Sequence, residues 1–218
     1  MDRRERKFVI SRRRGCDSLP GLFPVTPADM SQKNLQSSQS WADDVLRFWF
    51  EELSEADWFR SDPQLDDKIR ARFGELYAAL KAQPPVPGEL DASTLLAAVI
   101  VFDQFPRNIF RRSPEAYATD ALALELARYA VATGMDRALA TKQRHFLYLP
   151  FMHSEHREMQ AESVRLVSAL GIPDGLKYAD HHRGVVERFG RFPHRNAILG
   201  RQSTPEEIEF LKSEPPLV

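Results

Sequence analysis

Two segments of the chain combine the same residue types: residues 104–111 read QFPRNIFR, and residues 191–201 read RFPHRNAILGR. Each contains an aromatic residue, a proline, an Arg-Asn pair, an apolar patch and a closing arginine. Proline interrupts regular structure, and a charged side chain beside apolar residues is costly to bury unless it is paired. The two segments therefore predict two helix ends that meet at one polar site.

The arginines favour a site for an anion, because the planar guanidinium group is a forked donor that matches a carboxylate or a phosphate. The ligand would be a small anionic molecule or the acidic end of a peptide. A structural interpretation stays open, in which the arginines bond to helix C-terminal carbonyl groups and pack their stems on phenylalanines. The predicted ligand-binding residues are Arg107, Asn108, Arg111, Arg195, Asn196 and Arg201.

Asp103 immediately precedes the first segment, at the end of an otherwise apolar stretch. A carboxylate in such surroundings needs a partner, and we expect Asp103 to form a structural ion pair with Arg107, Arg111 or Arg195. Only the arginines left over after this pairing would be free to bind a ligand.

A third segment, residues 148–156, reads YLPFMHSEH and places histidines beside a carboxylate. Pro150 predicts a break before a new helix, which would put His153 and Glu155 in its first turn. The positive end of a helix lowers the pKa of a histidine there and favours a carboxylate. If the protein is an enzyme, we expect His153 or His194 to transfer protons and Glu155 to orient the histidine, with the arginines stabilising charge.

The same histidines have two other interpretations. They could cap the new helix, or His153 and His156 could be two ligands of a metal ion, with a third from His194 or Asp103. Their spacing differs from the H-E-x-x-H pattern of zinc hydrolases, and a single cysteine, Cys16, excludes a cysteine-based cluster. We therefore predict no metal site and no cofactor, and keep a metal-dependent hydrolase only as an alternative.

Helical spacing of apolar residues identifies the elements that would position these side chains. Asp62 before Pro63 is a suitable N-cap, Thr204 begins a capping sequence, and Gly134 ends a helix. No segment alternates as a strand does, so the expected class is all-α, a compact array of about eight antiparallel helices. The predicted helices cover residues 41–51, 63–82, 95–102, 114–133, 141–149, 153–170, 175–189 and 205–212.

The first forty residues differ in composition from the rest. They hold eight of the 30 Lys and Arg residues and four of the 31 Asp and Glu residues, which leaves a net charge of −5 on the remainder. We expect residues 1–40 to be a disordered basic and polar extension and residues 41–218 to form a single all-α domain. The acidic domain, with no apolar run of about 20 residues, predicts neither a nucleic-acid nor a membrane partner. The expected location is the cytoplasm, with mitochondrial targeting by the arginine-rich N-terminus as the alternative.

Four motifs resemble those of a known family. They are VLRFWF at 45–50, DQFPRNIFR at 103–111, YLPFMHSE at 148–155 and RFGRFPHRNAILGRQSTPEE at 188–207. They look like the uncharacterised bacterial family called domain of unknown function 924, over roughly residues 41–212. The resemblance implies an all-α, tetratricopeptide-like arrangement of antiparallel helices and brings no established activity.

Besides the metal-dependent hydrolase, two classes of function are compatible with these observations. The first is a helical protein whose polar cleft binds a small anionic ligand, with or without catalysis. The second is a protein–protein interaction module without catalysis, because tetratricopeptide-like arrays are usually protein-binding surfaces. The sequence lacks a clear 34-residue repeat, so we expect a compact domain rather than an open superhelix.

Overall fold

The computed structural model describes residues 40–58 and 60–213, within which all regular structure is helical. The predicted all-α class is confirmed. The extension predicted for residues 1–40 lies outside the described residues except for Ser40, which opens a helix that runs to residue 47. The further α-helices are α2 (Glu55–Trp58), α3 (Pro63–Ala82), α4 (Ala92–Val99), α5 (Phe105–Ile109), α6 (Asp120–Thr133), α7 (Thr141–Met152), α8 (Arg157–Ser168), α9 (Pro173–Phe189) and α10 (Pro205–Ser213).

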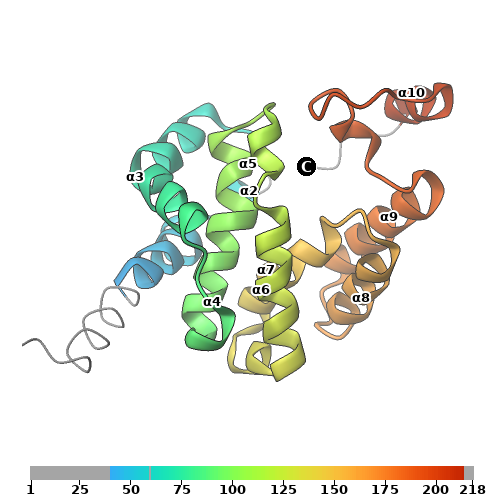
Figure 1. Cartoon of the computed structure of the whole chain (residues 1–218). Helices are drawn as coiled ribbons and strands as arrows, with labels where there is room; N and C mark the ends of the chain where they lie inside the picture. The colour runs from blue at the N-terminus through green and yellow to red at the C-terminus, as the bar shows by residue number, and fades with distance from the viewer. Residues whose placement is uncertain (1–39, 59, 214–218) are drawn as a thin grey trace, which may run out of the picture.

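Shorter helical turns join these helices. Two are π turns, η1 (Phe48–Glu52) and η3 (Ile100–Gln104); four are 3-10 turns, η2 (Pro87–Glu89), η4 (Pro114–Tyr117), η5 (Met135–Ala138) and η6 (Pro193–Arg195). Figure 1 shows α3 and α4 on one side of the molecule, α6 and α7 through its middle, and α8 and α9 on the other side. α7 packs against both α4 and α8, so it links the two sides.

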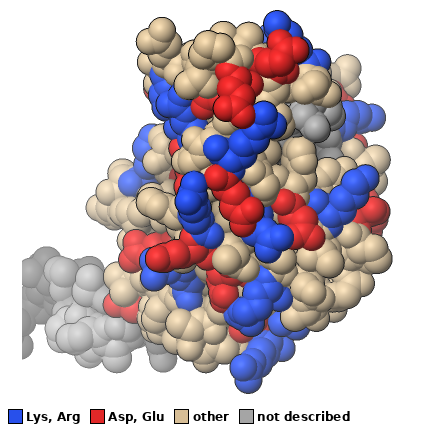
Figure 2. Space-filling view, turned by 90° about the vertical axis from the view of Figure 1, so that its right-hand side faces the viewer, with Lys and Arg blue, Asp and Glu red and all other residues tan. Residues whose placement is uncertain are grey.

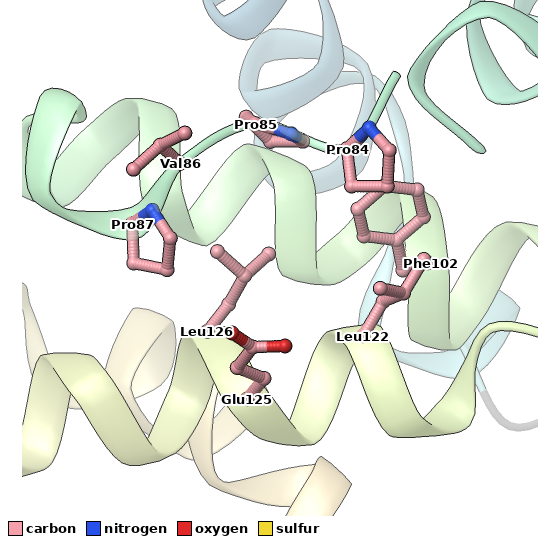
Figure 3. Close-up of a pocket in the computed structure, with 8 residues that line it drawn as sticks. All are labelled: Pro84, Pro85, Val86, Pro87, Phe102, Leu122, Glu125 and Leu126. Carbon is pink, nitrogen blue, oxygen red and sulfur yellow. The ribbon is translucent and has the colours of Figure 1, made fainter. Parts of the chain in front are cut away.

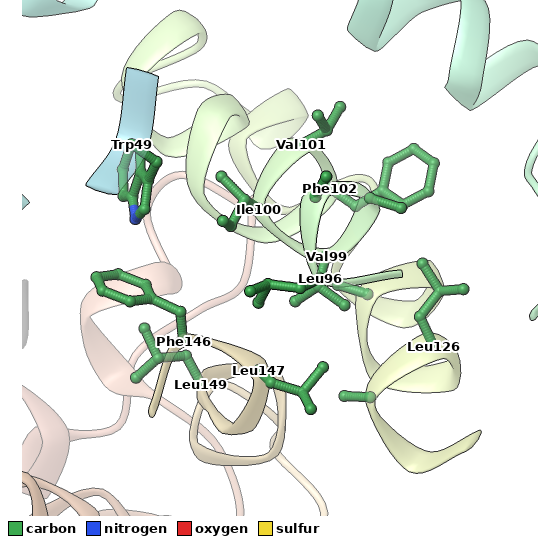
Figure 4. Close-up of a cluster of buried hydrophobic side chains, with 14 of the residues drawn as sticks. Trp49, Leu96, Val99, Ile100, Val101, Phe102, Leu126, Phe146, Leu147 and Leu149 are labelled. Atoms are coloured by element: carbon green, nitrogen blue, oxygen red, sulfur yellow. The ribbon is translucent and has the colours of Figure 1, made fainter. Parts of the chain in front are cut away.

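The stretch from Leu95 to Phe102, in α4 and η3, forms the centre of the core. Every side chain in it is at most 1% exposed, as expected for a helix that is apolar all round. Figure 4 shows Leu96 and Ile100 facing Phe146 and Leu147 of α7, with Trp49 closing one side. Burying each large side chain of this kind stabilises the fold by about 1.5–3 kcal/mol.

The helix predicted to end at Phe102 continues further, and the expected end was wrong. The backbone stays helical through η3 and α5, although Pro106 cannot donate a hydrogen bond to a preceding carbonyl. The hydroxyl of Thr119 donates to the carbonyl of Phe102, 2.7 Å away, and so supplies the bond that Pro106 cannot make. The side chains of the first Arg-Asn segment therefore stand on a continuous helical backbone.

Pro150 does not break its helix either. α7 runs through it to Met152, and the N–H of His153 still donates to the carbonyl of Leu149, 2.9 Å away. A proline so close to a helix end removes only one hydrogen bond. The burial of the apolar side chains around it stabilises the helix by more than this loss costs. The next helix therefore begins at Arg157 rather than at residue 153. The predicted helix 114–133 is likewise divided, into η4 and α6.

Asp62 caps α3 as predicted, because its side chain accepts a hydrogen bond from the backbone N–H of Gln64, 2.9 Å away. We expect Asp62→Ala to lower the free energy of unfolding by about 1 kcal/mol, the usual cost of removing an N-cap. Urea unfolding followed by circular dichroism measures the change. Asp67→Ala, which removes an exposed carboxylate of the same helix, is the control and should cost less than half as much.

Candidate functional site

Five ionisable side chains from separate elements meet at one place, which we call the central polar cluster. η3, α5 and η6 each supply one, α6 supplies an aspartate at its start, and the residue after α7 supplies a histidine. The members of the cluster are Asp103, Arg107, Asp120, His153 and Arg195. Both Arg-Asn segments and the histidine segment therefore contribute to a single site.

Asp103 anchors the cluster from a completely buried position. Its carboxylate accepts hydrogen bonds from Gln104 Nε2 at 2.5 Å and from Arg107 Nη2 at 3.2 Å, and it contacts His153 Nδ1 at 2.8 Å. Burial alone would raise the pKa of Asp103, but His153, Arg107 and Gln104 hold this pKa well below its usual range. Of the three arginines expected to pair with it, Arg107 is the partner.

His153 lies at the C-terminal end of α7, so the predicted place in the first turn of a helix was wrong. Burial lowers the pKa of His153, and the charge of Asp103 opposes this effect only in part. Its Nδ1 faces Asp103, whereas no described residue forms a hydrogen bond with its Nε2. Asp103 holds the ring at Nδ1, and 12% of the histidine side chain remains accessible to solvent.

Glu155 does not orient His153, contrary to the sequence-based expectation. Its carboxylate accepts two hydrogen bonds from Arg201, at 2.7 and 2.9 Å, and one from the backbone N–H of Phe192 at 2.8 Å. Asp103 has the orienting position instead. Asp103 and His153 are 50 residues apart in the chain, so no local pattern indicated this pair.

Asp120 is the member of the cluster that the sequence analysis missed. It accepts a hydrogen bond from Arg107 at 3.0 Å and a longer one from Arg195 at 3.4 Å. Burial and the nearby charge of Asp103 raise the pKa of Asp120, although both arginines oppose the shift. An aspartate in the first turn of a helix is common for electrostatic reasons alone, which is why its position gave no distinct signal.

Arg195 is buried, with 7% of its surface exposed, yet it is poorly paired. Its bond to Asp120 is its one ion pair among the described residues, and its Nε has no hydrogen-bond partner there. The guanidinium group lies between the rings of Tyr117 and Phe192, at 4.6 and 4.7 Å from their centroids. Burial and the charge of Arg107 lower the pKa of Arg195. Two aromatic faces thus fix the orientation of a cation that lacks a full set of acceptors.

Arg111 and Asn108, predicted to bind a ligand, are instead held by Asp66 of α3. Arg111 donates to both carboxylate oxygens, at 2.7 and 2.8 Å, and Asn108 donates to one of them at 2.9 Å. Burial would raise the pKa of Asp66, but these bonds lower it overall. The structural interpretation of the Arg-Asn segments applies here, because these side chains join α3 to the end of α5.

Arg201 and Asn196, also predicted to bind a ligand, form a hydrogen-bonded network with Glu155 and Glu207 at the other segment. Besides its bonds to Glu155, Arg201 donates to the Asn196 side-chain oxygen at 3.0 Å and to the carbonyl of Phe192 at 3.1 Å. Asn196 in turn donates to Glu207 at 3.2 Å. Glu207 also accepts two bonds from Arg191, which, with burial opposing them, lower its pKa to about 2. This network fixes the loop that carries η6.

Two further histidines lie near the cluster. His194, in η6, is partly buried, and burial together with the charge of Arg195 lowers its pKa to about 4. His182 of α9 is buried, 6.3 Å from His153 between ring centroids, and burial lowers its pKa to about 3. Both imidazoles are therefore neutral at pH 7. Within residues 40–58 and 60–213, no three His, Cys, Asp or Glu side chains are grouped as a metal site would require.

A hollow of about 270 Å³ lies between the proline-rich segment 84–87 and α6 (Figure 3). Its walls are mainly apolar: Leu122 and Leu126 of α6 face the prolines across the hollow, and Glu125 lies between the two leucines. The anionic ligand predicted from the sequence would find no arginine among its lining residues. The hollow is therefore no part of the central polar cluster.

The outer surface carries both signs of charge. Figure 2 shows Lys and Arg side chains interspersed with Asp and Glu over the face formed by the C-terminal helices. Many of these side chains pair locally, as Arg188 does with Glu206 and Arg183 with Asp180. No helix of the described part of the chain is both long and apolar enough to span a bilayer.

In this all-α fold, a buried aspartate, a histidine and two arginines from separate elements meet in one polar cluster. A sequence profile described as "Bacterial protein of unknown function (DUF924)" matches residues 45–215, and the chain belongs to this family. The family expected from the motifs is thus confirmed.

A solved structure has a similar fold, that of the protein of unknown function ATU0120 from Agrobacterium tumefaciens. The two are 39% identical in sequence, with a TM-score of 0.75, over 81% of this chain and 99% of the other. The comparison with curated proteins found no match. These relatives support the fold and leave the function to be inferred from the site.

Proposed function

We propose that this protein binds a small anionic molecule, through a carboxylate or phosphate group, at the central polar cluster. The observation that carries the proposal is the incomplete pairing of Arg195. A buried charge is expensive unless it is paired and hydrogen-bonded, and a buried donor without an acceptor needs a specific reason. An anion bound beside Arg195 would provide the missing acceptor.

The contrast with the other arginines of the two segments supports this assignment. Arg111 and Arg201 each donate two bonds to a carboxylate of their own, Asp66 and Glu155. Arg195 and Arg107 both donate to Asp120, and Arg107 donates to Asp103 as well, yet the Nε atoms of both arginines are buried without a partner among the described residues. The unmet hydrogen-bonding capacity of the segments is therefore concentrated at one point.

The aromatic rings beside Arg195 make the site ready for a ligand. A guanidinium group stacked on Tyr117 and Phe192 loses little conformational freedom when it forms new hydrogen bonds. The charge of Arg195 lowers the pKa of His194, so the neutral imidazole of His194 lies near the guanidinium group. The ligand would thus meet an oriented cation and an uncharged donor or acceptor.

A thermal-shift experiment tests the proposal with inorganic phosphate, phosphoenolpyruvate, 2-oxoglutarate, malate and citrate as probes. A ligand present at 100 times its dissociation constant stabilises the fold by about 2.7 kcal/mol. For a chain of this size, that gain raises the unfolding midpoint by about 5–10 °C. The shift should disappear in Arg195→Ala and persist in Arg188→Ala, which removes an exposed arginine of a surface ion pair.

The unliganded variants give an independent check. We expect Arg195→Ala to change the stability of the unliganded protein by less than about 1 kcal/mol, because Asp120 keeps its bond to Arg107 and a costly buried charge is removed. Failure of every anion to raise the midpoint, or an undiminished shift in Arg195→Ala, would contradict the proposal.

An interaction module without catalysis is the second proposed function. The observation in its favour is that Ile208 and Leu211 of α10, three residues apart on one helix, are 47% and 38% exposed. We also propose a cytoplasmic location and a tetratricopeptide-like arrangement of the helices. Among the described residues, no group of three metal-ligating side chains supports a metal-dependent hydrolase.

A further inference from the structure

The contact between Asp103 and His153 has the geometry of a proton-transfer pair. An ionised aspartate can only accept hydrogen bonds, so the 2.8 Å contact places the imidazole proton on Nδ1. The lone pair of the neutral ring is then on Nε2, the nitrogen that forms no hydrogen bond with any described residue. A histidine fixed in this tautomer is a base directed away from its carboxylate partner.

The surroundings of His153 are suited to a reaction that creates negative charge. Arg107 of α5 and Arg195 of η6 belong to the same cluster, and each has a buried Nε without a partner in the described chain. One guanidinium group can hold the carboxylate of a substrate, and the other can stabilise an oxyanion. The remaining ionisable groups around the ring are Asp103, Asp120, His145, His182 and His194.

No nucleophilic side chain completes a hydrolytic triad in the described part of the molecule. In such a triad, a serine or cysteine side chain donates to the free nitrogen of the histidine. The neighbouring hydroxyl of Ser154 accepts a bond from the backbone N–H of His156, 3.2 Å away, and the one hydrogen bond of the His153 ring among the described residues is that of Nδ1 with Asp103. The base is therefore placed to act on a bound ligand directly.

We propose that His153 is the general base of an enolisation reaction on a small 2-oxo acid, with Asp103 as its positioning residue. The inference rests on the anion site proposed above. His153 Nε2 takes a proton from the carbon next to the carbonyl group: that C–H bond breaks and an Nε2–H bond forms. The electron pair moves into the enolate, whose oxygen carries the negative charge toward the arginines. Return of the proton to carbon completes the cycle, and no other reactant is consumed.

Exchange of carbon-bound protons in D₂O tests this step. Proton NMR follows the loss of the C3 signal of 2-oxobutyrate and of 2-oxoglutarate in the presence of the full-length protein. General-base catalysis typically accelerates proton transfer by about 10²–10⁴-fold, so the wild-type rate should exceed that of buffer by at least about 100-fold. Arg188→Ala should match the wild type, whereas His153→Asn should fall to the buffer rate.

Asp103→Asn distinguishes a positioning residue from a merely structural one. Loss of the carboxylate charge lowers the pKa of His153 further, so the acid limb of the exchange rate should move to lower pH while the maximal rate falls. A structural role would reduce the amount of folded protein without moving that limb. Circular dichroism of each variant verifies folding, and His153→Gln replaces His153→Asn if the latter does not fold.

Absence of exchange above buffer with both acids, or undiminished exchange in a folded His153 variant, would overturn the inference. The thermal-shift experiment tests the anion site separately. If a probe still raises the midpoint of wild-type protein and of His153→Asn while no exchange occurs, the binding function holds and the enolisation step is refuted.

Discussion

Replacing Asp103 by alanine should lower the free energy of unfolding by about 3–5 kcal/mol, the usual cost of removing one partner from a buried ion pair. The carboxylate is completely buried and has bonding contacts with Gln104, Arg107 and His153. Without it, three polar groups from three elements lose an acceptor in a place that water reaches poorly. Urea unfolding monitored by tryptophan fluorescence measures the effect.

Asp180→Ala is the matched control for that substitution. Asp180 is half exposed and pairs with Arg183 within α9, so its loss should cost less than about 1 kcal/mol. A cost for Asp103→Ala as small as that of the control would mean that Arg107 and His153 find other partners without strain. The cluster would then not be the rigid unit that the hydrogen bonds indicate.

Acidification should destabilise the protein at pH values where most carboxylates are still ionised. His182 and His194 have pKa values of about 3 and about 4 in the folded protein, against about 6.5 in an unfolded chain. Below pH 6.5 the unfolded chain therefore binds protons that the folded protein does not bind, and the equilibrium moves toward unfolding. Between pH 7 and pH 4.5, each of the two histidines should remove about 2 kcal/mol of stability.

Urea unfolding at a series of pH values checks this expectation. The burial of His145 and His153 acts in the same direction, so the slope should be steep between pH 6.5 and pH 4.5. His182→Asn should make that slope shallower, whereas His156→Asn, which removes an exposed imidazole, controls for the substitution itself. Constant stability across this interval would show that the buried imidazoles accept protons in the folded state.

The local signals in the sequence predicted the helices well. Asp62 caps α3, Gly134 and Gly190 end α6 and α9 in the left-handed conformation, and Thr204 forms reciprocal bonds with Glu207 at the start of α10. Each of these features depends on residues within one turn of each other, so the pattern of residue types is sufficient. The helix starts predicted at Pro63 and Pro205 are confirmed, whereas the breaks expected at Pro106 and Pro150 were wrong because the effect of an internal proline depends on distant groups.

Prediction of the site was less complete for the same physical reason. The residue types were correct for Asp103, Arg107, His153 and Arg195, because a charged side chain among apolar neighbours must be paired or bound to be tolerated. Which carboxylate meets which cation is decided by packing between elements, and Asp66, Asp120 and Glu207 gave no sign of their partners in the linear pattern. The residues of the cluster could therefore be predicted from the sequence, whereas the number of donors left without a partner could not.

The π turn η3 joins the most apolar helix of the molecule to its polar cluster. A π turn accommodates one residue more than the α-helix would, and here the N–H of Phe105 reaches back to the carbonyl of Ile100. If Ile100–Gln104 closed into a regular α-helix with every residue kept, each residue after the turn would advance by one helical position and α5 would rotate by about 100° relative to α4. Arg107 would then turn away from Asp120, while the side chains of α4 kept their places. The extra residue in this helix therefore determines the direction in which Arg107 points, whereas the packing of α4 in the core does not depend on it.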